Sequence, residues 1–125
     1  MPTEIVVETK DRPGVIAEIG EVFGNARVNI KAAAAFAHRG MGYLHFVVDN
    51  ADRALAALKV GGWKVSQARE VLVVSLDDEP GELGRYARRL ADAGVSITAL
   101  YTLGERAGEK ELIVAVDDLA AARRA

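Results

Sequence analysis

The chain has 125 residues, a formal net charge of −2 at pH 7 and no cysteine. The absence of cysteine excludes disulfides, thiolate nucleophiles and cysteine-ligated zinc, and the acidic balance gives the whole chain no attraction for polyphosphate. Half of the residues are hydrophobic, which is ordinary for a packed globular protein and argues against disorder.

The first segments predict a strand followed by a helix. Residues 4–9 form a short β-branched run that stops at a proline-containing turn, residues 11–14. Apolar residues then recur over residues 15–23 with the 3.6-residue period of an amphipathic helix. A glycine and an asparagine follow directly and are suited to end that helix.

The next segments predict a hairpin, a second helix and a fourth strand. Alternation over residues 28–36 predicts a strand, and its apolar face is expected to hold Val28, Ile30, Ala32, Ala34 and Phe36. After a glycine turn, residues 42–48 alternate as the next strand. A capped helix follows, and Gly61-Gly62 breaks it before a strand at residues 63–65. The predicted order is βαββαβ.

The same order occurs twice, because one unit of the sequence is duplicated. Three segments of the first half return at an offset of 67 or 68 residues: 11–14 as 78–81, 26–30 as 93–97, and 44–49 as 112–117. Duplication of a whole supersecondary unit takes precedence over the single domain that the length alone favours. We predict an α+β protein of two modules, residues 1–69 and 70–125.

The second unit stops before its fourth strand. Its predicted elements are a strand at 70–76, a helix at 80–93, strands at 95–103 and 111–116, and a helix from about 118. In a ferredoxin-like sheet with the order 4-1-3-2, the missing strand leaves the first strand of the unit at an open edge. Open edges are usually covered or paired, so we expect a neighbouring chain there, in a homodimer.

Each repeat places a Pro-Gly turn between a strand and a helix, where main-chain N–H groups and the positive end of the helix dipole favour an anion. Gly14 and Gly81 have no Cβ and let a ligand approach the main chain, and the preceding prolines are expected to preset the first helical φ. Asn29 and Ser96 begin the second strand of their units and offer side-chain oxygens. The pattern indicates a site for an amino acid, although the same turn is also an ordinary helix start.

The segments 11–17 and 26–30, with 78–81 and 91–97, resemble the signature of ACT domains, and the whole chain is similar to small stand-alone tandem ACT proteins. The resemblance implies two ferredoxin-like modules that bind a free amino acid, or a similar small effector, at the interface between paired modules. By position, it implies as ligand-binding residues Asp11, Arg12, Pro13, Gly14, Val15, Asn29 and Ile30 in the first unit, and Pro80, Gly81, Glu82, Ser96 and Ile97 in the second. Ser96 replaces the usual Asn and the last strand is absent, which favours a pairing role for the second unit.

The expected partners follow from this interpretation. We expect a small-molecule effector, a homodimer and a regulated enzyme that the protein contacts in trans, with no cofactor, no metal and no nucleic acid. The beginning of the chain has neither a basic region nor the roughly 18 apolar residues of a membrane span, so we expect a cytoplasmic protein without a membrane partner.

An RNA-recognition module is one alternative, since it has the same βαββαβ order. Residues Arg39–Phe46 nearly match its RNP1 octamer and lie on the third strand. That module stacks bases on exposed rings at the third and fifth octamer positions and on the first strand. Only Tyr43 satisfies this pattern, because Met41 takes the third position and the first strand has no ring. We therefore favour a site for a small molecule.

Two further alternatives concern function rather than fold. The duplicated unit is also compatible with a pure oligomerisation domain that binds no ligand. An enzyme is disfavoured, because His38 and His45 are the only histidines and neither lies near a serine or a pair of acids with catalytic spacing. We expect no catalytic residues.

Overall fold

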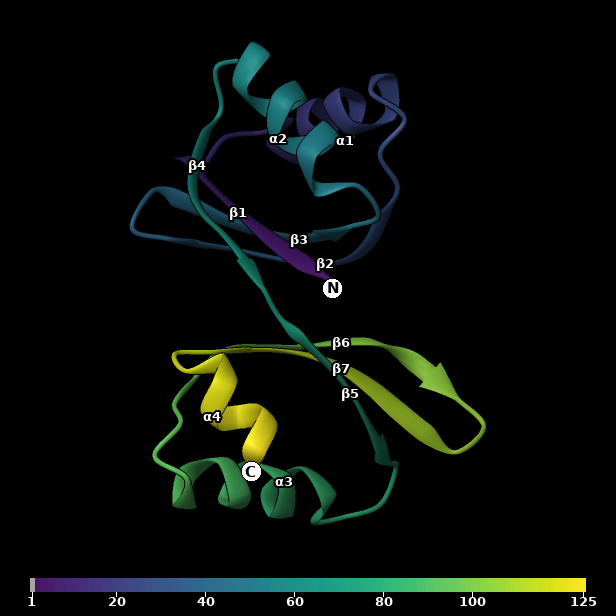
Figure 1. Ribbon diagram of the computed structural model, residues 1–125. Coiled ribbons are helices and arrows are strands. Elements are labelled where there is room, and N and C mark those ends of the chain that lie inside the picture. Colours follow the sequence, from purple (N-terminus) through teal and green to yellow (C-terminus); the bar gives the residue numbers. More distant parts are fainter. Residues whose placement is uncertain (1) are drawn as a thin grey trace. The chain divides into compact units, whose positions relative to one another are not determined.

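The computed structural model describes residues 2–125, which form an α+β protein of two compact units (Figure 1). Residues 2–69 form one unit and residues 70–125 the other, hereafter module 1 and module 2. None of the helices formed by residues 2–125 has the length and apolar character needed to cross a lipid bilayer.

Module 1 has the complete βαββαβ order. Its elements are β1 (Thr3–Lys10), α1 (Val15–Asn25), β2 (Ile30–His38), β3 (Met41–Val48), α2 (Ala51–Val60) and β4 (Lys64–Glu70). The sheet order is β2-β3-β1-β4, with β3 antiparallel to both of its neighbours. This is the predicted ferredoxin-like order, with β4 longer than the three residues expected from the sequence.

The core of module 1 forms where the two helices cover one face of the sheet. Ile19 and Phe23 project from α1, Leu58 projects from α2, and all three are almost completely buried. Phe23 meets Phe46 of β3 edge to face, with ring centroids 5.3 Å apart. The period of 3.6 on the helices and of 2 on β1 and β3 brings these side chains together.

Strand β2 departs from the predicted alternation. Ile30 pairs with Val48, but the next paired residue is Ala32, opposite Val47, so Lys31 is an extra residue in a bulge. Ile30 therefore lies on the helix-covered side, whereas Ala32, Ala34 and Phe36 lie on the other. The prediction that all of them share one face was wrong, because a bulge reverses the alternation and leaves no mark in the pattern of residue types.

Module 2 repeats the order without the last strand. Its elements are β5 (Leu72–Asp77), α3 (Glu82–Asp92), β6 (Ile97–Arg106), β7 (Glu109–Val116) and α4 (Leu119–Arg124). The three strands are ordered β5-β7-β6, so β5 lies at an edge of the sheet, as the duplicated order requires when a fourth strand is missing. Leu90 of α3, at the position equivalent to Phe23, is 1% exposed in the core.

Helices α1 and α3 each end with the same kind of backbone hydrogen bond, but the left-handed residue that permits this bond differs between them. The N–H of Val28 donates to the carbonyl of Phe23, and the N–H of Val95 to the carbonyl of Leu90, both at 2.9 Å. The residue before each donor is left-handed, with φ of 60° at Arg27 and 77° at Gly94. Glycine adopts this conformation without the steric cost that a side chain brings.

Replacing Arg27 by glycine is therefore expected to raise the free energy of unfolding of module 1 by about 0.5 kcal/mol. The change removes the steric cost of a side chain in the left-handed conformation, and the conformational entropy that glycine adds to the unfolded chain offsets part of this gain. The matched change Gly94→Ala is expected to lower that of module 2 by about 1 kcal/mol. Urea unfolding followed by circular dichroism measures both. A loss of stability in Arg27→Gly would contradict this account of the helix end.

Candidate functional site

The turn before α1 leaves the first helical N–H groups without a side-chain cap. Gly14 is the N-cap residue with φ of 93°, and no side chain accepts a hydrogen bond at this end. Gly81 repeats the arrangement before α3 with φ of 89°. Pro13 and Pro80 precede these caps and so do not occupy the first helical position. The expected role of the prolines was wrong, since the left-handed glycines separate them from the helices.

The turn of module 1 opens onto a hollow of about 380 Å³, which is within the size range of small-molecule pockets. Its rim includes Lys10, Asp11 and Arg12 from the end of β1 and the turn. Its apolar wall comes from α1 and from the helix-facing sides of β2 and β3, and includes Val15, Ile16, Ala35, Ala37 and Leu44. Charged groups, free N–H groups and apolar surface therefore meet in one place.

Arg12 is held by an ion pair across the turn. Its guanidinium donates to the carboxylate of Glu18, and both side chains are about half exposed. This hydrogen bond lowers the pKa of Glu18 from its usual value and raises that of Arg12. The pair fixes a cation at the mouth of the hollow, but it also places an anion beside the first turn of α1.

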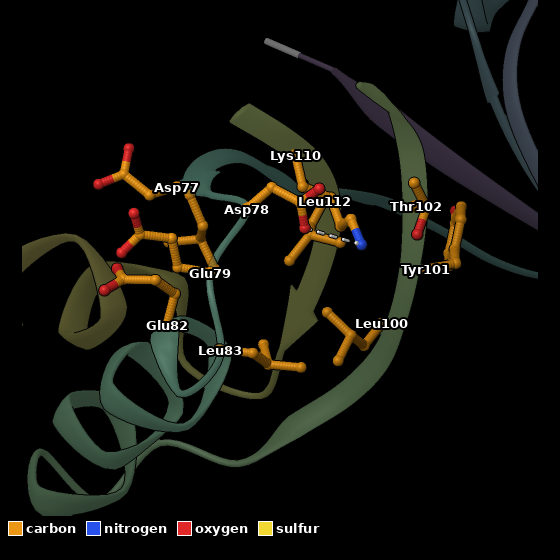
Figure 2. A pocket seen from close by; sticks show the side chains of 11 residues that line it. Asp77, Asp78, Glu79, Glu82, Leu83, Leu100, Tyr101, Thr102, Lys110 and Leu112 are labelled. Atoms are coloured by element: carbon orange, nitrogen blue, oxygen red, sulfur yellow. Dashed lines mark ion pairs between the residues drawn. The ribbon is translucent and has the colours of Figure 1, made fainter. Parts of the chain in front are cut away.

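Module 2 has an equivalent hollow of about 360 Å³ with the opposite charge (Figure 2). Asp77 and Glu79 stand where module 1 has Lys10 and Arg12. Asp78 and Glu82 add two more carboxylates, and the only cationic lining residue is Lys110, whose Nζ lies 3.5 Å from an Asp78 carboxylate oxygen. Figure 2 shows Leu83 and Leu100 forming an apolar side of the same hollow. A carboxylate ligand is disfavoured here.

The structure brings only some of the predicted site residues together. The module 1 hollow is lined by Asp11, Arg12, Gly14 and Val15, and the module 2 hollow by Glu82. Pro13 adjoins the first hollow in sequence, as Pro80 and Gly81 adjoin the second, and none of the three lines it. Asn29 and Ile30, like Ser96 and Ile97, line neither hollow.

The strand-start residues lie at the far end of each first helix. The N–H of Asn29 donates to the carboxylate of Asp49 at 3.0 Å, and the N–H of Ser96 donates to that of Asp117 at 2.9 Å, which ties each strand start to the end of the neighbouring strand. An eleven-residue helix such as α1, about 16 Å long, separates this end of a module from its turn. Within one module, the turn and the strand start do not form a single site.

Lys10, Ile16, Ala35, Ala37 and Leu44 of the hollow were not identified from the sequence. Lys10 and Ile16 flank the motif directly, so extending the motif by two residues on each side would have found them. The two alanines could be found only with the register of β2. That register depends on the bulge at Lys31, for which the sequence has no signal.

A buried charge cluster lies on the face of the module 1 sheet opposite α1 and α2. The carboxylate of Glu4 is completely buried and lies 3.1 Å from Nδ1 of His45 and 3.0 Å from both Nε and Nη2 of Arg69. Its members come from β1, β3 and β4, so only tertiary structure assembles them. Among residues 2–125, no group of three or more His, Asp or Glu is arranged to hold a metal ion.

Phe36, Tyr43 and His45 stack on the same face. The ring centroid of Phe36 is 6.1 Å from that of Tyr43 and 5.7 Å from that of His45. The sequence indicated Tyr43 as the only ring at a base-stacking position of the RNP1-like segment, and the cross-strand register adds Phe36 beside it. These rings contact one another, and β1, one of the two central strands of the sheet, contributes Glu4 and Glu8 to this face rather than a ring. The face therefore lacks the basic, aromatic β1 of an RNA-recognition module.

A comparison with known protein families finds a match to module 1. Residues 3–60 match the profile of the ACT domain, which covers module 1 from β1 to the end of α2. No match to a curated protein was found.

Solved structures resemble the chain over nearly its whole length. A crystal structure of a protein from Bacteroides thetaiotaomicron has a TM-score of 0.87 at 20% identity, covering 98% of this chain and 83% of that one. The regulatory subunit of aspartate kinase from Thermus flavus has a TM-score of 0.73 at 18% identity, covering 98% and 88%. The ligand-free form of that subunit from Thermus thermophilus has a TM-score of 0.71 at 18% identity, covering 98% and 89%. The chain has the fold of two tandem ferredoxin-like modules, and the first of them matches the ACT domain.

Proposed function

We propose that the protein is a small regulatory protein of two ACT modules that binds a free amino acid, or a similar small effector, at the turn of module 1. The observation that carries this proposal is the hollow beside Gly14, where uncapped helix N–H groups, two cationic side chains and one carboxylate surround an apolar wall. The match of residues 3–60 to the ACT domain supports a regulatory role without catalysis.

The chemistry of the hollow suits a zwitterion with a modest apolar side chain. The effector carboxylate would accept hydrogen bonds from the first-turn N–H groups of α1, where the helix dipole and Arg12 also favour negative charge. Asp11 offers a partner for the ammonium group. Leu44 and the small residues Ala35 and Ala37 leave an apolar space for the side chain.

Module 2 is proposed not to bind the same effector. Four carboxylates line its hollow against one lysine, so an effector carboxylate would be repelled there. We expect one effector per chain, with Pro80, Gly81, Glu82, Ser96 and Ile97 serving the structure and pairing of module 2.

A complete site would need a second module. The turn and Asn29 lie at opposite ends of α1, so an effector that touches both a turn and a strand start must take them from different modules. A second copy of the chain can supply the missing half, which supports a homodimer. Solved structures of similar fold include regulatory subunits of aspartate kinase, and this supports the proposal that the protein regulates an enzyme in trans. The cytoplasmic location stays a prediction from the sequence.

Thermal unfolding in the presence of each of the twenty amino acids at millimolar concentration tests the proposal. We expect at least one to raise the melting temperature, because a ligand that binds only the folded state stabilises it. Ala35→Leu fills the hollow and is expected to abolish that rise. Ala33→Leu is the matched control: it lies on the same side of β2, opposite Phe46, and does not line the hollow.

Three outcomes are informative. No rise with any amino acid overturns effector binding and leaves an oligomerisation domain. A rise that persists in Ala35→Leu places the effector elsewhere. Two effectors per chain by titration calorimetry would contradict the assignment of binding to module 1 alone.

The Arg12–Glu18 ion pair makes a further prediction. Removing the charge of Glu18 frees Arg12 for the effector and removes an anion from the first turn of α1. Glu18→Gln is therefore expected to tighten binding by up to about fivefold, the range of one exposed ion pair. Glu21→Gln removes a charge from the same helix without touching Arg12 and should leave the affinity nearly unchanged. Weaker binding by Glu18→Gln would contradict this role of the pair.

A further inference from the structure

The helices of module 2 carry a surface rich in arginine. Tyr86 and Leu90 of α3 share a core cluster with Ala122 of α4, so both helices cover the same face of the β5-β7-β6 sheet (Figure 1). The buried residues of each helix point toward the sheet, and its arginines are exposed on the solvent side. This set, hereafter the arginine surface, consists of Arg85, Arg88, Arg89, Arg123 and Arg124.

The duplicated module shows that the fold does not require these arginines. At the equivalent positions, with an offset of 67 for α3 and of 68 for α4, module 1 holds Glu18, Glu21, Val22, Leu55 and Ala56. None of these residues is a cation, and module 1 still forms two helices against its sheet. The arginine surface belongs to module 2 alone, which indicates a role other than folding.

Two members of the arginine surface have no acidic partner. Among residues 2–125, Arg88 and Arg124 form no ion pair. Arg85 and Arg123 each have an exposed ion pair with a glutamate, and Arg89 lies over an aromatic ring of its own helix. Exposed ion pairs contribute little free energy, so an incoming anion can replace them at a small cost.

The choice of arginine at all five positions narrows the class of partner. A guanidinium binds a carboxylate or a phosphate through two parallel hydrogen bonds, whereas the ammonium of lysine acts as a point charge. Residues 70–125 contain a single lysine, Lys110, and it lines the acidic hollow rather than the helices. A partner that fits this surface is therefore rich in carboxylates or in phosphates.

The surroundings of the arginine surface favour carboxylates over the phosphates of a nucleic acid. Glu79 and Glu82 lie at the start of α3 and Asp92 at its end, so acidic residues bound the arginines along a helix about 16 Å long. Module 2 as a whole holds seven Lys and Arg against eleven Asp and Glu, a net charge of −4. The phosphate backbone of a duplex extends past both ends of such a patch and meets these carboxylates, whereas a short protein segment fits between them.

We propose that the arginine surface is a docking site for a carboxylate-rich segment of a partner protein. Charge complementarity identifies the occupant as a row of Asp or Glu side chains along one side of a helix or strand. The site goes beyond the effector site, because it belongs to the helices of module 2 and needs no bound small molecule. It gives the second module a function of its own.

Fluorescence anisotropy with a labelled helical peptide that presents glutamates along one face tests this docking. The full chain is expected to bind the peptide at low salt and to release it as the salt concentration rises. Arg88→Gln with Arg124→Gln is expected to weaken binding about tenfold at low salt. The matched control is Lys59→Gln with Lys64→Gln, which removes two exposed cations of module 1 and is expected to weaken binding less than about twofold.

A charge-conserving variant separates the geometry of the guanidinium from its charge. Arg88→Lys with Arg124→Lys keeps both charges but loses the paired hydrogen bonds, so we expect binding about threefold weaker than that of the unchanged protein. Circular dichroism spectra of all variants are expected to match, because the substituted side chains are exposed.

The contrary outcomes are distinct. Absence of peptide binding by the unchanged protein, or an equal loss in the glutamine variants of the arginines and of the lysines, overturns the proposal. Tighter binding of double-stranded DNA than of the peptide, lost when the two arginines are replaced, would assign the surface to phosphates and overturn it as well. The measurement needs no effector, so failure to find a ligand for module 1 leaves it unaffected.

Discussion

Phe23→Ala is expected to lower the free energy of unfolding of module 1 by about 3–5 kcal/mol. The side chain is 1% exposed and packs edge to face on Phe46 in the core between α1 and the sheet. Its removal loses both the buried apolar surface and the aromatic contact, and it leaves a cavity that the surrounding core cannot fill. Urea unfolding followed by circular dichroism measures the loss.

The matched control is Ile16→Ala on the same helix. Ile16 is 54% exposed, so this change is expected to alter the free energy of unfolding by no more than about 0.5 kcal/mol. A loss in Phe23→Ala as small as in Ile16→Ala would contradict the position of the core. Leu90→Ala should produce a comparable loss in module 2, since Leu90 occupies the equivalent position.

Arg69→Met is expected to cost about 3 kcal/mol at neutral pH, because it removes one partner of a completely buried carboxylate. Methionine keeps much of the volume of the arginine stem, so the loss reports the charge and its hydrogen bonds. After the change, Glu4 retains the contact with His45 but loses both donors of the guanidinium. Chemical unfolding at pH 7 measures the effect.

The double variant Glu4→Gln with Arg69→Met separates charge from packing. It is expected to recover a large part of the stability, because the buried charge is gone as well as its partner. Lys64→Met, an exposed cation on the same strand, is expected to change little. If Arg69→Met and Lys64→Met behaved alike, the Glu4 cluster would not contribute to the stability of module 1.

The sequence alone was sufficient to predict the order of the helices and strands and the position of the Pro-Gly turn in each module. The first helix of each module has its own apolar period, and the turn before it has its own proline and glycine, so neighbouring residues determine both. The offset of 67 residues then showed the duplication, and with it the order of the elements in module 2. The same local signals placed Asp11, Arg12, Gly14 and Val15 at one turn, where the structure finds the hollow.

Only the tertiary structure decided how the remaining residues are arranged. The bulge at Lys31 moves Ile30 to the helix side, and residue types do not record an extra residue in a strand. The length of α1 separates Asn29 from the turn, and the pairing of β1 with β3 and β4 buries Glu4 between His45 and Arg69. Local interactions determine helices and turns, but contacts between residues far apart in sequence depend on strand register, which is set when the whole sheet packs.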